Sequence, residues 1–291
     1  MSRHHSISVL AIMTIAFSSL VIADSQVGRP LPRICERPVA VSVSPEGTAM
    51  AIVDDFSGRI FVTDFFGRIL WTTVCADAGL HPRAVCLLSE QELVFISKEH
   101  HRLYRVIRQT AANCDSVAEL SFLFKDKAEP TIVTKMPDNS LLLYDKSSGL
   151  LSLLSPDKDS ALPYPLKVTG RALSVAVSPS RRVVVSARGH RPIQVFSSSG
   201  DFIVAPGWSG SPSEQNWDAR PVAVDIRERI WAADLTNRQI RIFDMAGAEV
   251  GSVPFPAGLD RPVAIACASD AAVIIVFENG YMIRYEETAT H

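Results

Sequence analysis

The feature that most constrains this chain is a short opening segment that recurs along it at intervals of about 40 to 50 residues. Three copies read Arg-Pro-Val-Ala and begin at Arg37, Arg220 and Arg261. Looser versions of the same opening stand at three further places, His81, Glu129 and Arg171. A period of this length is typical of chains that use one supersecondary unit many times.

Inside each unit, short apolar runs alternate with turns that contain Gly or Pro. In the first unit these runs cover residues 39–43, 50–53, 60–63 and 69–72. Their content of Val, Ile, Phe and Thr favours strands, and the spacing predicts an antiparallel meander. A four-stranded sheet cannot bury both faces alone, so the units are expected to pack face to face around an axis. The sequence therefore predicts an all-β fold, a six-bladed β-propeller of four-stranded antiparallel blades.

The last unit is incomplete. It begins near residue 260 and has only three clear strands before the chain ends. An apolar segment at residues 27–34 precedes the first blade and is a candidate for the missing strand. Because closing a ring by such an exchange removes its free edges, we expect the mature N-terminal strand to complete the sixth blade.

The first 23 residues have the pattern of a secretory signal peptide. A weakly basic start precedes a nearly uncharged apolar run at residues 6–22, and the small residue Ala23 stands before Asp24. The alternative is a membrane anchor, for which this run is at the short limit. We predict a signal peptide at 1–23, a single propeller domain at 24–291, and a secreted or extracytoplasmic protein without a stable membrane span after cleavage.

Charge and cysteine content exclude several classes of partner and site. The formal net charge of −2 gives no positive excess for neutralising phosphates, so nucleic-acid binding is not expected. The chain has five cysteines and no Cys-x-x-Cys pair, which disfavours a zinc ribbon. Cys35 and Cys75 each precede the first strand of a blade and form the best candidate disulfide, whereas Cys86 and Cys267 lie in apolar strands and are expected in the core.

The fifth unit carries the most specific likeness to a known family. Residues 221–225 (Pro-Val-Ala-Val-Asp), 230–234 (Ile-Trp-Ala-Ala-Asp) and 237–244 (Asn-Arg-Gln-Ile-Arg-Ile-Phe-Asp) resemble an NHL repeat. The resemblance implies six blades, but it leaves the function open, because such propellers bind proteins, RNA or ligands and some are enzymes. Within the motif we expect Asp234 to cap a turn or to pair with a blade-opening arginine, with Asp54 or Asp55 doing the same in blade one.

No catalytic set is recognisable. The amidating-lyase relatives of this family hold zinc with converging histidines, but the histidines of this chain stand at different levels of their blades, His81, His100, His101 and His190. Gluconolactonase-like propellers hold a cation with Glu, Asn and Asp near the axis, where this chain has arginine or histidine. We therefore predict no catalytic residues, no metal and no cofactor.

Two features are candidates for binding. Five basic blade-opening residues are expected at one mouth of the central channel, where they would favour a carboxylate, sulfate or phosphate, namely Arg37, His81, Arg171, Arg220 and Arg261. Alternatively, each arginine pairs with an acid of its own or an adjacent blade. A polar loop between Trp208 and Trp217 is the second candidate, either as a contact site or with both rings covering apolar surface.

Together these observations favour a non-enzymatic binding module for a protein or a small anionic or carbohydrate-like ligand. The alternative is a propeller hydrolase or lyase with an unrecognised site at the channel mouth.

Overall fold

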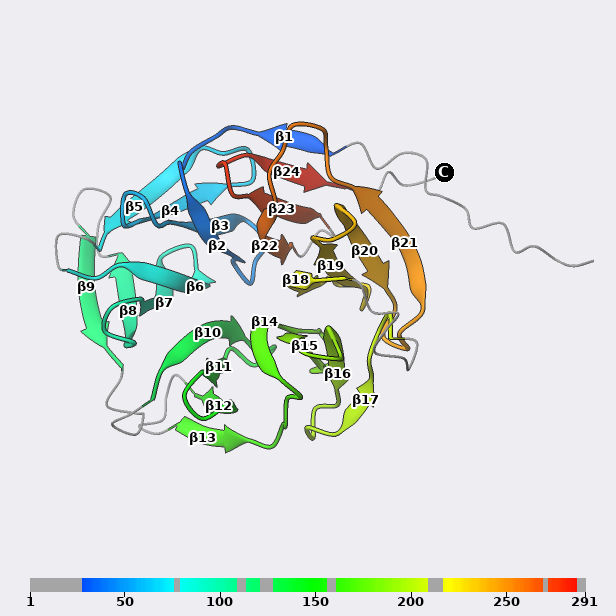
Figure 1. Ribbon diagram of the computed structural model, residues 1–291. Coiled ribbons are helices and arrows are strands. Elements are labelled where there is room, and N and C mark those ends of the chain that lie inside the picture. Colours follow the sequence, from blue (N-terminus) through cyan, green and yellow to red (C-terminus); the bar gives the residue numbers. More distant parts are fainter. Residues whose placement is uncertain are drawn as a thin grey trace, which may run out of the picture.

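The computed structural model describes residues 28–75, 79–108, 114–120, 128–155, 161–208, 217–268 and 272–286. Over these residues the chain forms six four-stranded antiparallel sheets arranged in a ring, with no helix (Figure 1). The predicted six-bladed β-propeller is confirmed. No described helix is long and apolar enough to span a membrane. The expected signal peptide at 1–23 lies outside the described residues.

Blade one consists of β2 (Pro38–Val43), β3 (Ala49–Asp54), β4 (Arg59–Asp64) and β5 (Ile69–Val74). Blade two consists of β6 (Pro82–Ser89), β7 (Glu92–Ser97), β8 (Leu103–Arg108) and β9 (Cys114–Glu119). Blade three consists of β10 (Pro130–Lys135), β11 (Leu141–Asp145), β12 (Leu150–Leu154) and β13 (Ala161–Tyr164).

Blade four consists of β14 (Arg171–Val177), β15 (Val183–Arg188), β16 (Ile193–Phe196) and β17 (Phe202–Val204). Blade five consists of β18 (Ala219–Val224), β19 (Ile230–Asp234), β20 (Gln239–Phe243) and β21 (Glu249–Pro254). Blade six consists of β22 (Pro262–Cys267), β23 (Val273–Phe277), β24 (Met282–Tyr285) and β1 (Arg29–Leu31).

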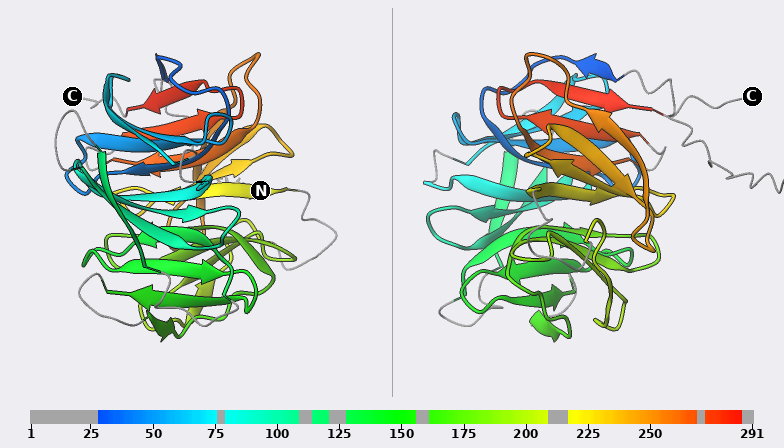
Figure 2. Two further views of the ribbon diagram at one scale, coloured as in Figure 1. Left: turned by 90° about the vertical axis from the view of Figure 1, so that its left-hand side faces the viewer. Right: turned by 45° about the vertical axis from the view of Figure 1, so that its right-hand side comes forward.

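The ring closes through an exchanged strand, as the sequence predicts. β1 pairs antiparallel with β24, and Leu31 lies opposite Met282. Both views of Figure 2 place β1 (blue) beside β24 (red). Leu31 is buried in the core cluster that joins blades one and six. The segment before blade one therefore contributes both hydrogen bonds and apolar burial to closure.

The core lies between neighbouring blades rather than inside any one of them. Six clusters of buried residues each combine side chains of two adjacent blades, and together they run around the whole ring. The second strand of a blade is covered on both faces, as every residue of β3 (Ala49–Asp54) is buried. This double covering explains why such strands are continuous apolar runs rather than alternating ones.

Aspartates at the end of the second strand fasten the blade openings and the turns. Asp54 accepts a hydrogen bond from the backbone N–H of Arg37 at 2.7 Å and from the Ser57 hydroxyl at 2.6 Å. Burial alone would raise the pKa of Asp54, but the hydrogen bonds from Ser57 and Arg37 outweigh it and lower the pKa. Asp234 accepts from the backbone N–H of Asn237 at 3.0 Å, which confirms its expected role as a turn cap.

The expected disulfide between Cys35 and Cys75 is wrong. Cys35 has a free thiol and packs between blades one and six, whereas Cys75 packs between blades one and two. Equivalent places in two successive repeats thus belong to different interfaces. Burial raises the pKa of Cys35 to about 12, with the nearby charge of Asp54 adding to the effect. Cys86 is buried as expected, and Cys267 is half-buried at the channel wall.

Deleting residues 24–31 should lower the melting temperature by roughly 5–15 °C, because it removes β1 and the burial of Leu31. Deleting residues 24–27 is the matched control, since it leaves β1 in place. Thermal unfolding followed by circular dichroism measures both. Equal melting temperatures for the two deletions would show that β1 does not stabilise the ring.

Replacing Asp54 with asparagine should destabilise the fold at neutral pH and make it less sensitive to acid. A carboxyl whose pKa is lowered by folding stabilises the protein above its unfolded pKa, and that stabilisation is lost as the pH falls through the folded pKa. The free energies of unfolding of the parent and of Asp54→Asn should therefore converge below about pH 4. Urea titrations across the acid range measure this, and a constant difference would contradict it.

Candidate functional site

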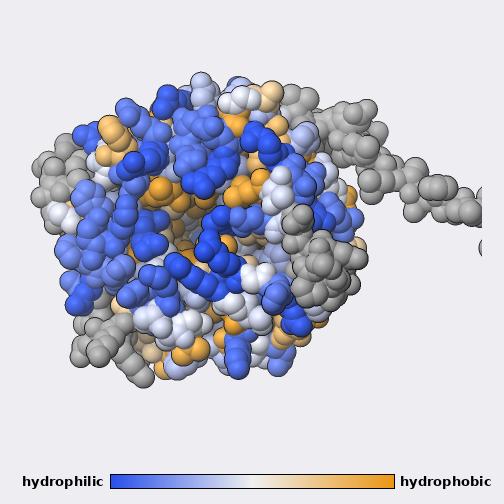
Figure 3. Space-filling model, viewed as in Figure 1, coloured by the Kyte–Doolittle hydropathy of each residue, from blue (hydrophilic) through white to orange (hydrophobic). Residues whose placement is uncertain are grey.

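A channel of about 910 Å³ runs along the axis of the ring. Its wall is formed by the innermost strand of every blade, namely β2, β6, β10, β14, β18 and β22. Figure 3 shows the centre of the molecule hollowed, with hydrophilic residues around the rim and hydrophobic residues in its depth. The volume lies within the range of small-molecule sites in proteins.

Every innermost strand carries an irregularity near its start, just inside one mouth of the channel. In each of five blades, the pairing between the first and second strands skips one residue of the first strand. These residues are Val39, Arg83, Thr131, Leu173 and Val263. In blade five the pairing skips both Arg220 and Pro221. All of them line the channel. Because a β-bulge re-aims the side chain it carries, this level of the ring decides what the mouth presents.

Three of the five predicted site residues line this mouth, and each is neutralised by an acid of its own blade. Arg37 pairs with Asp55 at 2.8 Å. Arg220 pairs with Asp218 at 2.5 Å. Arg261 makes two contacts with Glu278, at 2.9 and 2.8 Å. For these three arginines the structure realises the alternative in which each pairs with a neighbouring acid. Such exposed pairs contribute about 0–1 kcal/mol each.

The other two predicted residues do not line the described wall. His81 is half-buried at the start of blade two, where its carbonyl accepts a hydrogen bond from the Lys98 backbone at 2.7 Å. Arg171 is the first residue of β14 and is exposed. Its positive charge nevertheless acts on the mouth, because it lowers the pKa of Arg83. Arg171 therefore adds positive potential beside the channel without forming its surface.

Arg83 is the site residue that the sequence analysis missed. It occupies the bulge of β6, half-buried in the wall, and it has no ion pair among the described residues. Burial lowers the pKa of its guanidinium, the neighbouring Arg171 lowers it further, and Glu129 opposes the shift. Arginine nevertheless remains charged in proteins. The mouth thus holds a charged guanidinium that has no ion pair among the described residues.

A sequence signal for Arg83 does exist. Alignment of His81-Pro82-Arg83 with Arg37-Pro38-Val39 puts the charge of blade two at a bulge position where blade one has valine. Three other blades have an apolar residue at this bulge, Val39, Leu173 and Val263, and a charge in place of an apolar wall residue indicates a functional role.

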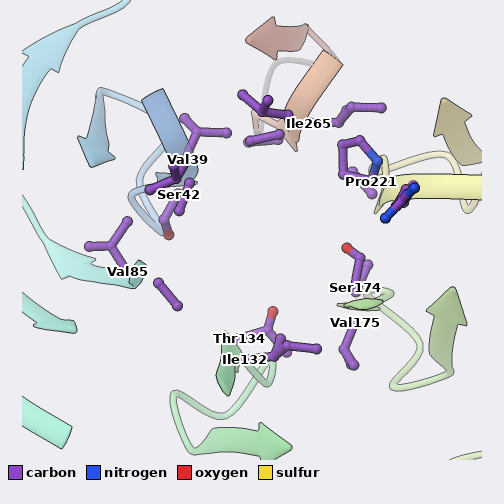
Figure 4. Close-up of a pocket in the computed structure, with 18 of the residues that line it drawn as sticks. Val39, Ser42, Val85, Ile132, Thr134, Ser174, Val175, Pro221 and Ile265 are labelled. Carbon is purple, nitrogen blue, oxygen red and sulfur yellow. The ribbon is translucent and has the colours of Figure 1, made fainter. Parts of the chain in front are cut away.

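Below the mouth the wall is mainly apolar. Figure 4 shows Val39, Val85, Ile132, Val175 and Ile265 around the channel, together with the hydroxyls of Ser42, Thr134 and Ser174. Two of these hydroxyls accept hydrogen bonds from the backbone of the next blade. Ser42 Oγ accepts from Leu87 N at 3.0 Å, and Ser174 Oγ accepts from Val222 N at 3.3 Å. Hydroxyls in the wall therefore link blades together.

A second cation stands at the far end of the wall. Lys135 is the last residue of β10 and lines the channel. Burial lowers the pKa of its amine, whereas Cys86 and Glu46 raise it. The channel thus has an arginine-rich mouth, an apolar middle and one lysine at the opposite end.

The two tryptophans of the predicted interaction loop are both held by arginines. The guanidinium of Arg191 lies 4.7 Å from the ring centre of Trp208. Trp217 is only 9% exposed and packs on Phe243, while Arg241 lies 4.5 Å from its ring centre. The loop between the tryptophans lies outside the described residues, so its role in partner contact stays a prediction.

The described residues contain no cluster of three or more His, Cys, Asp or Glu side chains that could hold a metal. At the mouth the acids Asp55 and Glu278 already pair with Arg37 and Arg261, an arrangement that does not suit a divalent cation. The expected lack of a metal or cofactor stays a prediction.

No protein-family profile matches the chain, and no curated protein matches it in sequence. Solved structures are similar in fold. Virginiamycin B lyase from Staphylococcus aureus has a TM-score of 0.61 and 12% identity, covering 90% of this chain and 98% of the lyase. A catalytically inactive variant of that lyase with quinupristin has a TM-score of 0.61 and 13% identity, with the same coverage. A structural-genomics target described as a gluconolactonase has a TM-score of 0.68 and 15% identity, covering 91% of this chain and 93% of the target.

Proposed function

We propose that this chain is an extracytoplasmic, NHL-like binding module that takes a small anionic ligand at the arginine-rich mouth of its channel. The observation that carries the proposal is Arg83, a half-buried cation in the channel wall without an ion pair among the described residues. The NHL assignment rests on the repeat sequence, and the extracytoplasmic location rests on the pattern of residues 1–23.

The arrangement of charges favours an anion over a neutral or cationic ligand. Arg83 and Arg171 are close enough for one to lower the pKa of the other, so their mutual repulsion disfavours the empty site. A carboxylate or phosphate at the mouth would relieve this repulsion and accept charge-assisted hydrogen bonds from Arg83. Arg37 and Arg261 already pair with Asp55 and Glu278, so the positive charge available to the ligand comes mainly from Arg83 and Arg171.

An enzyme is the second candidate, because the propellers similar in fold include a lyase and a protein described as a gluconolactonase. Elemental analysis and native mass spectrometry of residues 24–291 separate the two candidates. Stoichiometric zinc or calcium would favour the enzyme, whereas a metal-free protein that binds anions would favour the module.

Titration with citrate and phosphate tests the module directly. We expect saturable binding, seen as thermal stabilisation and by calorimetry, that Arg83→Gln weakens about tenfold or more. Arg171→Gln should weaken it less, because that side chain does not line the wall.

Arg68→Gln is the matched control, since it removes the same charge from an exposed turn residue that pairs with Asp64. Equal losses for Arg83→Gln and Arg68→Gln would mean that net charge alone attracts the anion. No saturable binding by the parent protein would refute the proposed function.

A further inference from the structure

We infer that the ligand is an amphiphile, with its anionic group at the Arg83 mouth and an unbranched apolar chain extending down the channel. This inference rests on the proposed function for the position of the anionic group. It adds the chemical class of the ligand, which comes from a separate observation, the nature of the wall below the mouth.

The wall exposes apolar side chains that an apolar chain would cover. Val41 and Val43 of β2, Ile132 of β10 and Val177 of β14 all line the channel and are only half-buried. Each also packs against a core cluster between two blades, so only the exposed remainder of each side chain faces the channel. Covering such surface is favourable by about 25 cal/mol for each Å² removed from water. The hydrophobic depth below a hydrophilic rim is visible in Figure 3.

The hydroxyls of the wall favour an alkyl chain over a sugar. A sugar needs hydrogen-bonding partners along its whole length, because polar groups buried without partners are unfavourable. Ser42 and Ser174 already bind the backbone at Leu87 and Val222 of the next blade. Of the hydroxyls labelled in Figure 4, only that of Thr134 is outside these links. The side chains in the depth of the channel therefore offer a sugar few hydrogen-bonding partners.

The charges at the two ends orient the chain. Lys135 lies four residues beyond the bulge residue Thr131, which places it roughly 13 Å further along the strand. Three further arginines, Arg37, Arg220 and Arg261, line the mouth with Arg83. Arg171 stands beside it as a further positive charge, which Glu129 partly offsets. The mouth therefore gathers more cationic side chains than the end at Lys135.

A series of straight-chain carboxylates, from acetate through butyrate and hexanoate to octanoate, tests the inference on residues 24–291. We expect calorimetry to show affinity rising about fourfold for each methylene that enters the channel. Octanol should bind more weakly than octanoate, and Arg83→Gln should remove that difference. Val41→Thr should weaken octanoate and leave acetate unchanged.

Val117→Thr is the matched control, because Val117 lies exposed on β9, the fourth strand of blade two. Melting temperatures of all variants verify folding.

The outcomes separate this inference from the proposed function. Equal affinity for acetate and octanoate would overturn the apolar chain and leave the anion site intact. Octanoate binding that is lost in Lys135→Gln but kept in Arg83→Gln would overturn the orientation and the proposed anion site together. Octanol binding as tightly as octanoate would support an apolar channel and refute the anion site.

Discussion

The structure depends on burial between blades. A blade has no core of its own, because its apolar side chains are covered only by the neighbouring blades. A blade at an open end would expose one face and one edge to water. The ring therefore has to close, and β1 with Leu31 provides that closure against β24. The six repeats are thus one cooperative unit, although their sequences have diverged.

This arrangement separates stability from binding. The second strands carry the packing, whereas the innermost strands have one side against the core and the other toward the axis. Residue types at the channel differ between blades whose strand pairing is alike. Arg83 occupies a bulge position that holds Val39 in blade one and Leu173 in blade four, and the surrounding strand pairing is the same. The charge pattern of the channel can therefore differ from blade to blade without a change of fold.

The sequence predicts the blades and their closure because both follow from period and strand count, which are local properties. It fails for Cys35 and Cys75, since a repeat does not reveal which of two blade interfaces a residue before the first strand enters. Its five basic residues share one place in the repeat, but acids nearby neutralise three of them. Arg83 escapes notice because a bulge, which shifts the pairing register, brings it to the wall. Residue types at the mouth are thus predictable, while their net charge depends on tertiary pairing.

The exchange of β1 into blade six also sets an order of events during biosynthesis. β1 precedes every other strand in the chain, and its partner β24 follows all the others. β24 must therefore emerge from the ribosome before the last pairing forms. Until then the polypeptide remains an open array without its final contact. Closure of the ring is therefore a late event, which separates the formation of single blades from the formation of the finished propeller.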